Sequence, residues 1–92
     1  MDNTNDTTEN TNTLNEVTAI IYSTPVCHYC QAAKEFFKEN KVSYEDINVA
    51  ENAEKRQEMI EMTGQMGVPV IRIGNDVVIG FDEGKLKELL GV

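Results

Sequence analysis

The spacing of apolar residues along this chain changes from the period of a strand to that of a helix and back. A β-branched and aromatic run at residues 17–22 is typical of a buried strand, and residues 23–25 break it. From residue 28 to residue 40, apolar side chains recur every three or four positions, which predicts an amphipathic helix that stops near Asn40. Residues 42–49 alternate well enough for a second strand.

The second half of the chain contains one more helical pattern and then two short strand patterns. Residues 51–63 predict an amphipathic helix that ends at Gly64. Two strands are expected at 68–73 and 77–79, and Gly74-Asn75-Asp76 between them is typical of a hairpin turn.

A last helix is predicted from Asp82, a good N-cap residue, with Phe81 and Leu86 spaced as a hydrophobic staple. The predicted order is therefore strand, helix, strand, helix, strand, strand, helix. The first three elements make a right-handed βαβ unit with parallel strands, and the rest adds an antiparallel hairpin with a covering helix. We expect an α/β fold in which three helices flank a four-stranded mixed sheet.

The first fifteen residues have a different composition from the rest. They are almost wholly Asn, Thr, Asp and Glu, and Leu14 is their only large apolar residue after Met1. Such a segment buries too little apolar area to offset the entropy of ordering it. The sequence therefore predicts a disordered acidic and polar tail over residues 1–15 and one domain over residues 16–92.

The charge balance narrows the classes of partner. The formal net charge of −8 does not suit a nucleic-acid-binding surface, which needs a basic patch, and it argues equally against anionic membranes. No apolar run approaches the ~18 residues that a membrane span needs, and the N-terminus lacks the basic start and apolar run of a secretory leader. We expect a cytoplasmic monomer with no nucleic-acid or membrane partner.

Cys27-His28-Tyr29-Cys30 lies where the first strand gives way to the first helix. Residues three apart on a first helical turn have Cα atoms roughly 5–6 Å apart, which is within the range that a disulfide tolerates. Cys27 is placed at the helix start, where free N–H groups and the macrodipole favour an anion, and thiolates are the species that attack disulfides. We therefore predict that Cys27 is the nucleophile and Cys30 the resolving thiol.

Other uses of the pair fit less well. Zinc requires four ligands, and the only further cysteine or histidine is His28 inside the motif. Haem attachment requires a histidine directly after the second cysteine, where this chain has Gln31. A purely structural disulfide would close too short a loop to constrain the unfolded chain much. Redox chemistry is favoured, and no metal site is expected.

Three segments together resemble the glutaredoxins: residues 24–30, residues 63–69 and residues 80–82. The resemblance covers roughly residues 17–92 and is closest to small microbial glutaredoxin-like proteins, including redoxins that supply electrons to ribonucleotide reductase. It implies a thioredoxin-like fold and a thiol–disulfide oxidoreductase that forms a mixed disulfide with its substrate. It also implies no bound cofactor, disulfide-containing protein substrates, and electrons from glutathione or from a thioredoxin reductase-type flavoenzyme.

The resemblance also assigns a substrate-binding surface. Pro69 would follow a cis peptide bond, and the backbone of Val68 would pair with a substrate segment beside Cys27; the alternative is an ordinary trans proline that opens a strand. Tyr29 either borders the substrate groove or covers the helix start. Asp82 either holds an amine of a glutathione-like ligand or only caps the last helix.

The chain departs from the family pattern at several of these positions. His28 replaces a common proline, and it either stabilises the neighbouring thiolate when protonated or is an exposed residue of little effect. Glutathione-using members usually carry a lysine at the position of Thr24, and a basic residue and threonine where this chain has Met66-Gly67. The missing cations weaken the case for binding the carboxylates of glutathione, and they favour the flavoenzyme donor.

A second hypothesis from a different class is a glutaredoxin-like module that binds an iron–sulfur cluster through Cys27. Other features have simpler interpretations. Lys34 and Lys38 of the first helix either tune the local potential or lie on a solvated face, and the solvated face is favoured. Met59, Met62 and Met66 are expected to fill core and groove.

Overall fold

The computed structural model describes residues 18–92, so the predicted tail and the first two residues of the predicted domain lie outside the described residues. Seven elements follow in the predicted order: β2 (Ala19–Ser23), α2 (His28–Glu39), β3 (Tyr44–Asn48), α3 (Ala53–Thr63), β4 (Val70–Ile73), β5 (Asp76–Ile79) and α4 (Glu83–Leu90). Within residues 18–92, no helix has the length and apolar character that crossing a membrane requires.

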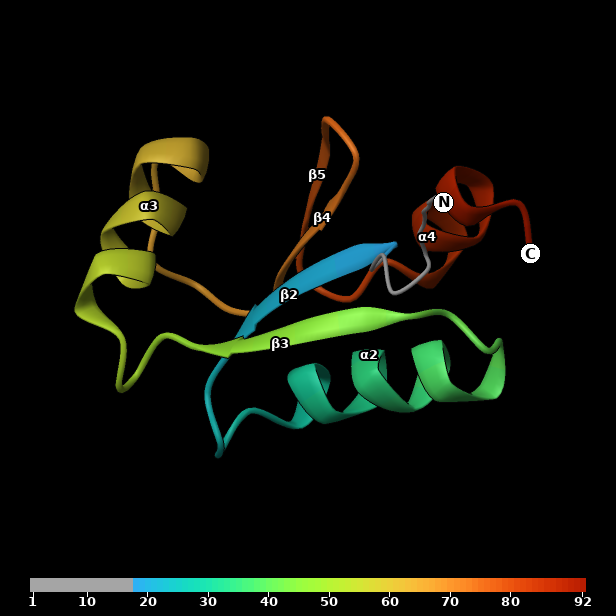
Figure 1. Ribbon diagram of the computed structural model, residues 1–92, viewed down its shortest axis with the longest axis horizontal. Coiled ribbons are helices and arrows are strands. Elements are labelled where there is room, and N and C mark those ends of the chain that lie inside the picture. Colours follow the sequence, from blue (N-terminus) through green and yellow to red (C-terminus); the bar gives the residue numbers. More distant parts are fainter. Residues whose placement is uncertain (1–17) are drawn as a thin grey trace, which may run out of the picture.

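The four strands form one sheet in the order β3-β2-β4-β5 (Figure 1). β2 runs parallel to β3, because α2 carries the chain back between them, whereas β4 is antiparallel to both β2 and β5. A short turn joins β4 to β5, and Gly74 within it has a φ of +62°. The predicted α/β fold with a four-stranded mixed sheet and three helices is confirmed.

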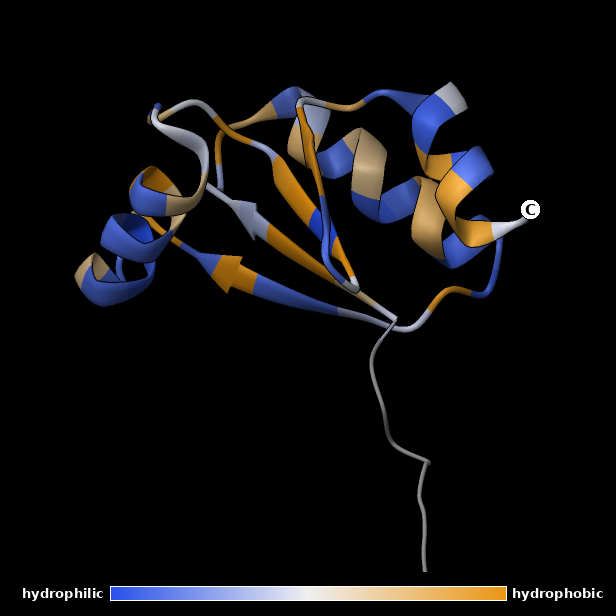
Figure 2. Ribbon diagram, turned by 90° about the horizontal axis from the view of Figure 1, so that it is seen from above, coloured by the Kyte–Doolittle hydropathy of each residue, from blue (hydrophilic) through white to orange (hydrophobic). Residues whose placement is uncertain are grey.

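The helices divide between the two faces of the sheet, and α2 and α4 lie on one face while α3 lies on the other (Figure 2). Successive side chains of a strand point to opposite faces. Ile21 and Ile71 therefore join the apolar cluster under α2 and α4, and their neighbours Tyr22 and Val70 join the cluster under α3. Two separate cores thus hold the sheet in place.

Each helix has the end signals that its sequence predicts. Asn52 caps α3 by accepting a hydrogen bond from the Lys55 N–H, and Gly64 ends it in the left-handed conformation with a φ of 73°. Asp82 caps α4 in the same way through the Lys85 N–H. Phe81, just before that cap, packs against the cluster that contains Leu86, as expected for a hydrophobic staple.

Several strand boundaries differ from the prediction by one or two residues, and two of them lie next to the cysteine motif. β2 extends through Ser23, because that residue still pairs with Asn48 of β3 and is only 2% exposed. β4 begins at Val70, because Val68 and Pro69 belong to the approach to the strand and lie outside the ladder. Both boundaries lie at the end of the sheet that leads to the cysteine motif.

Candidate active site

Cys27 is the N-cap of α2. Its φ and ψ of −91° and 115° are extended, and its sulfur accepts a hydrogen bond from the Cys30 N–H at 3.2 Å. A serine or aspartate oxygen usually accepts this bond at a helix N-cap. Here a sulfur takes that place, so an N–H donor and the positive end of the helix both face the atom that would carry negative charge.

Cys30 lies one turn further along α2 and is fully buried, whereas Cys27 is partly exposed. Burial, reinforced by the hydrogen bond with Cys27, raises the pKa of Cys30 to about 12. At neutral pH Cys30 is therefore a protonated thiol. The two cysteines are unequal in the way that the predicted division into an attacking and a resolving thiol requires.

The approach to β4 runs beside Cys27. The peptide bond between Val68 and Pro69 is cis, as the resemblance implied. The Cys27 thiol donates to the Val68 carbonyl oxygen at 3.8 Å. The structure thus brings the backbone of Val68 and the predicted nucleophile together, although 41 positions separate them in sequence.

The side chain of Gln65 holds this approach segment in shape. Its Oε1 accepts from the Gly67 N–H at 2.6 Å, and its Nε2 donates to the Gly67 carbonyl at 3.2 Å and to Thr63 Oγ1 at 3.3 Å. A Cβ added at Gly67 would lie 2.6 Å from Gln65 Oε1. The threonine common in the family at this position would therefore require the carboxamide to move.

Three large apolar side chains of the cysteine motif and of the approach to β4 are exposed. Val26 is 87% exposed, Tyr29 is 69% exposed, and Met66 is 67% exposed. His28 is exposed as well. Of the methionines expected to fill core and groove, Met59 is fully buried in the core and Met66 lies at the surface.

Segment 80–82 approaches the same loop from the other side. The Gly80 N–H donates to the Pro69 carbonyl oxygen at 2.8 Å, which ties the end of β5 to the residue after Val68. Asp82 follows two residues later, and its Oδ1 accepts from the Lys85 N–H at 3.2 Å. The capping role of Asp82 is thus directly visible, and its predicted contact with a ligand stays a prediction.

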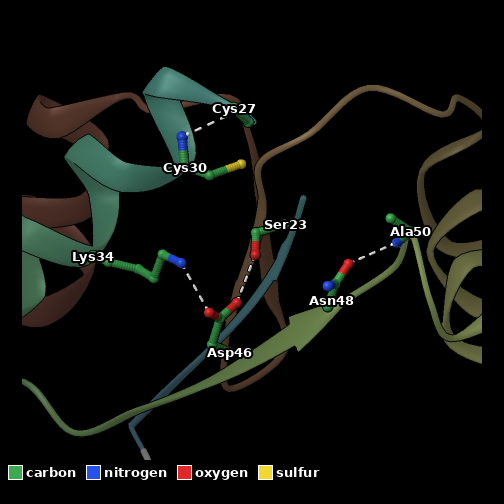
Figure 3. A network of polar contacts seen from close by, with 7 residues as sticks. All are labelled: Ser23, Cys27, Cys30, Lys34, Asp46, Asn48 and Ala50. Atoms are coloured by element: carbon green, nitrogen blue, oxygen red, sulfur yellow. Dashed lines mark hydrogen bonds and ion pairs between the residues drawn. The ribbon is translucent and has the colours of Figure 1, made fainter. Parts of the chain in front are cut away.

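A polar network that sequence reasoning missed lies behind Cys30. Lys34 Nζ lies 2.9 Å from Asp46 Oδ2, and the Ser23 hydroxyl donates to Asp46 Oδ1 at 2.6 Å (Figure 3). The Lys34 side chain is only 17% exposed, so the expectation of a solvated lysine is wrong. The available signal was the spacing, because Cys30 and Lys34 are four residues apart and share one helix face.

The hollows in the surface do not all lie at the cysteine motif. One hollow, of about 580 Å³, lies between the end of β3 and the start of α3, and none of its lining residues belongs to the cysteine motif or to the Val68-Pro69 segment. A smaller one of about 270 Å³ lies beside the polar network and includes Thr24 and Gln31. Among residues 18–92, no three histidine, cysteine, aspartate or glutamate side chains gather closely enough to hold a metal ion.

Known proteins provide a direct comparison. The glutaredoxin family model matches residues 19–78. An uncharacterized glutaredoxin-like 8.6 kDa protein in the rubredoxin operon of Clostridium pasteurianum is 39% identical over 70 residues, which cover 76% of this chain and 93% of that protein.

Solved structures agree with this family. The glutaredoxin of Archaeoglobus fulgidus superposes with a TM-score of 0.73 at 28% identity, over 83% of this chain and 88% of that one. The glutaredoxin-like NrdH-redoxin from Escherichia coli, described by its thioredoxin-like activity profile, superposes with a TM-score of 0.67 at 25% identity, over 77% and 92%. This chain belongs to the glutaredoxin family, and that membership together with its Cys27–Cys30 pair supports a thiol oxidoreductase.

Proposed function

We propose that this protein reduces disulfides by a dithiol mechanism in which Cys27 attacks and Cys30 resolves. The observation that carries the proposal is the difference between the two sulfurs. Cys27 is accessible at a helix N-terminus and accepts a hydrogen bond from the Cys30 N–H, whereas Cys30 is buried and protonated. Only the first is placed to meet a substrate, and only the second is placed to act within the molecule.

The reaction follows from this arrangement. The Cys27 thiolate attacks one sulfur of the substrate disulfide, a new S–S bond forms, and the other substrate sulfur leaves with the electron pair. Cys30 then loses its proton and attacks Cys27 Sγ, which releases the second substrate sulfur as a thiolate. The substrate gains two electrons and two protons, and the protein is left with a Cys27–Cys30 disulfide.

The surroundings of Cys27 favour a protein segment as the substrate. Val26, Tyr29 and Met66 offer exposed apolar area beside the sulfur, and we assign His28 to the rim of the same surface. The backbone of Val68 lies beside Cys27, where an extended segment can pair with it. A disulfide-bearing enzyme such as ribonucleotide reductase is the partner class that the resemblance indicates, met by a monomer in the cytoplasm.

A thioredoxin reductase-type flavoenzyme is the electron donor that the site favours over glutathione. Thr24, Met66 and Gly67 occupy positions at which glutathione-using relatives carry cations or threonine. Without those groups, the two carboxylates of glutathione lose charge-assisted partners. The similarity to an NrdH-redoxin with a thioredoxin-like activity profile supports the same donor.

The order of the two cysteines is tested by replacing each with serine. Cys27→Ser is expected to abolish reductase activity, because it removes the attacking sulfur. Cys30→Ser is expected to accumulate a mixed disulfide with the substrate, visible as added mass that a reductant removes. Full activity of Cys27→Ser would contradict the assignment.

The donor is tested by following NADPH consumption during reduction of a small disulfide. One reaction supplies glutathione with glutathione reductase, the other supplies a thioredoxin reductase, and each has a Cys27→Ser control. Turnover with the flavoenzyme alone is expected. Turnover with glutathione alone would make the protein a glutathione-dependent member despite Thr24 and Gly67.

The iron–sulfur hypothesis stays a prediction that no contact within residues 18–92 favours. Brown colour and visible absorbance after anaerobic purification would support it. A colourless protein with two titratable thiols would contradict it.

A further inference from the structure

In the resolving step Cys30 must react as a thiolate, although its buried surroundings disfavour the charged form. Cys30 is 0% exposed, and burial raises its pKa to about 12. Only a very small fraction of such a thiol is ionised at neutral pH, yet its thiolate must attack the sulfur of Cys27. A fixed positive charge nearby would increase that fraction without itself gaining or losing a proton.

The structure contains a cation in this place. Lys34 follows Cys30 by one helical turn on α2, and the side chains of both extend from the same side of the helix toward the strand ends (Figure 3). The Lys34 ammonium acts to lower the pKa of Cys30, and Cys30 in turn acts to raise the pKa of Lys34.

Asp46 and Ser23 fix the position of this cation. Asp46 bonds Lys34 Nζ through one carboxylate oxygen at 2.9 Å and accepts from the Ser23 hydroxyl through the other at 2.6 Å. The three residues come from α2, β3 and β2, so the network joins the helix to two strands. A hollow of about 270 Å³ beside Lys34 and Asp46 keeps the pair in contact with water, which can take up a released proton.

The protonation states of the pair decide which member can assist Cys30. Burial acts to raise the pKa of Asp46, but the hydrogen bonds from Lys34 and Ser23 prevail, and the pKa is lowered. Such a carboxylate is a poor base for a thiol with a pKa of about 12. The hydrogen bond to Asp46 raises the pKa of Lys34, which therefore keeps its charge throughout the working range of pH.

We propose that Lys34, held by Asp46 and Ser23, is a positioning residue whose fixed ammonium favours the Cys30 thiolate during resolution of the mixed disulfide. This inference rests on the dithiol mechanism proposed above. Within residues 18–92, the other titratable groups that act on Cys30 or on Lys34 are Cys27, Asp46 and Tyr44, and the Thr24 backbone bonds to Cys30. In the mixed disulfide Cys27 no longer titrates, and the Lys34 ammonium still acts to lower the pKa of Cys30.

The step conserves atoms and electrons. The Cys30 proton passes to water, and the Cys30 thiolate attacks Cys27 Sγ. The bond between Cys27 Sγ and the substrate sulfur breaks, and its electron pair leaves with the substrate thiolate. The Lys34 ammonium is charged before and after the step and exchanges no proton.

Stopped-flow mixing of the reduced protein, in slight excess, with dithiobis(nitrobenzoate) separates the two steps. Attack by Cys27 releases one coloured nitrobenzoate thiolate, and resolution by Cys30 releases the second, so the two phases report the two cysteines. Both rates are recorded between about pH 6 and pH 10, a range that brackets ordinary thiol titration.

Replacing Lys34 gives the central comparison. Lys34→Met is expected to slow the second phase about tenfold at neutral pH and to move its pH profile upward by about one unit. The first phase should stay within about twofold of the unmodified protein. Lys34→Arg, which keeps the cation, is expected to restore the second phase. Lys38→Met is the matched control, because Lys38 is an exposed lysine on the same helix.

Asp46→Asn distinguishes the proposed role from that of a general base. The amide can still accept from Lys34 but no longer offsets its charge, so the second phase is expected to accelerate about twofold to fivefold. A second phase slowed as strongly as in Lys34→Met would overturn the proposal, as would a Lys34→Met protein with an unshifted pH profile. Thermal unfolding of each reduced variant identifies a purely structural loss, which lowers stability without moving that profile.

The same experiment distinguishes failure of the proposed dithiol mechanism from failure of the role proposed for Lys34. If the unmodified protein released only one thiolate, or if Cys27→Ser still gave the first phase, the dithiol mechanism itself would be wrong. If the unmodified protein gives two phases, Cys30→Ser gives one, and Lys34→Met matches the unmodified protein, only the role of Lys34 fails.

Discussion

At the scale of single residues, the chemistry of this protein depends on how one helical turn separates two environments. Cys27 belongs to the end of the helix, where backbone N–H groups are free, and Cys30 belongs to the core. The same residue type thus meets two different environments, as the proposed division into an attacking and a resolving thiol requires. Lys34 extends the arrangement by another turn, where its ammonium bonds Asp46 and its side chain is only 17% exposed.

The titration of Cys30 predicts how the stability of the reduced protein depends on pH. Its folded pKa of about 12 lies above the ordinary thiol value of 9.0. The folded state therefore favours the proton, so this contribution to stability is complete below about pH 9 and declines as pH rises toward 12. The free energy of unfolding should fall by at most about 1.4 kcal/mol per pH unit on this account.

Denaturant unfolding between about pH 7 and pH 10.5 measures this decline. Cys30→Ser, which keeps Cys27 and every other titrating group, is the control. Parallel curves for the reduced protein and for Cys30→Ser would mean that burial does not shift the pKa of Cys30.

At the scale of elements, the approach to β4 is shaped by a side chain. The Gln65 carboxamide satisfies both backbone groups of Gly67, and the segment then places Val68 against Cys27. Such local pairing of a side chain with backbone lets a short segment keep one shape without belonging to a strand or helix. The proposed substrate surface is thus positioned by the end of α3 and the start of β4 together.

Gln65→Ala removes this pairing. We expect the free energy of unfolding to fall by about 1 kcal/mol, typical for lost hydrogen bonds that water can partly replace. For a protein disulfide substrate, KM should rise several-fold while kcat changes little, because the cysteines keep their places. Gln57→Ala on exposed α3 surface is the control, and an equal rise in KM there would contradict the interpretation.

The elements were largely predictable from local patterns, and the contacts between them were not. The period of apolar residues gave the seven elements in order, and the end residues Asn40, Gly64 and Asp82 gave helix limits to within a residue or two. Cys27 and Cys30 were predicted as the reactive pair because their spacing and their place at a strand end are typical of redox chemistry. Local sequence patterns do not indicate which distant residue a side chain will contact, so the ion pair between Lys34 and Asp46 could not be predicted from the sequence.

At the scale of the whole molecule, one thin sheet serves two cores. Ile21 and Tyr22 are neighbours in β2 but belong to different clusters, and Ile71 and Val70 divide in the same way in β4. Because both clusters depend on the same two central strands, loss of packing in either cluster is expected to destabilise the other as well. In so small a domain, each cluster carries a large share of a modest total stability.

Phe37→Ala tests this dependence. Phe37 is fully buried and contacts Phe36 and Tyr44 in tilted and edge-on ring pairs. Its truncation should lower the free energy of unfolding by about 3–5 kcal/mol. Far-ultraviolet circular dichroism reports the whole backbone, and the absorbance of a variant that keeps Tyr22 but carries phenylalanine at Tyr29 and Tyr44 reports the cluster under α3. The two signals should give the same midpoint. Two distinct midpoints would show that the cores unfold separately.

The unequal exposure of the two sulfurs also makes the protein a reporter of its own folding. An alkylating reagent applied briefly to the reduced native protein should add a single adduct, at Cys27, because Cys30 is shielded. In an unfolded molecule both cysteines are modified. The ratio of doubly to singly modified protein therefore gives the fraction of molecules that are unfolded. Quality control in a cell could be followed in this way with intact mass alone, without any label or antibody.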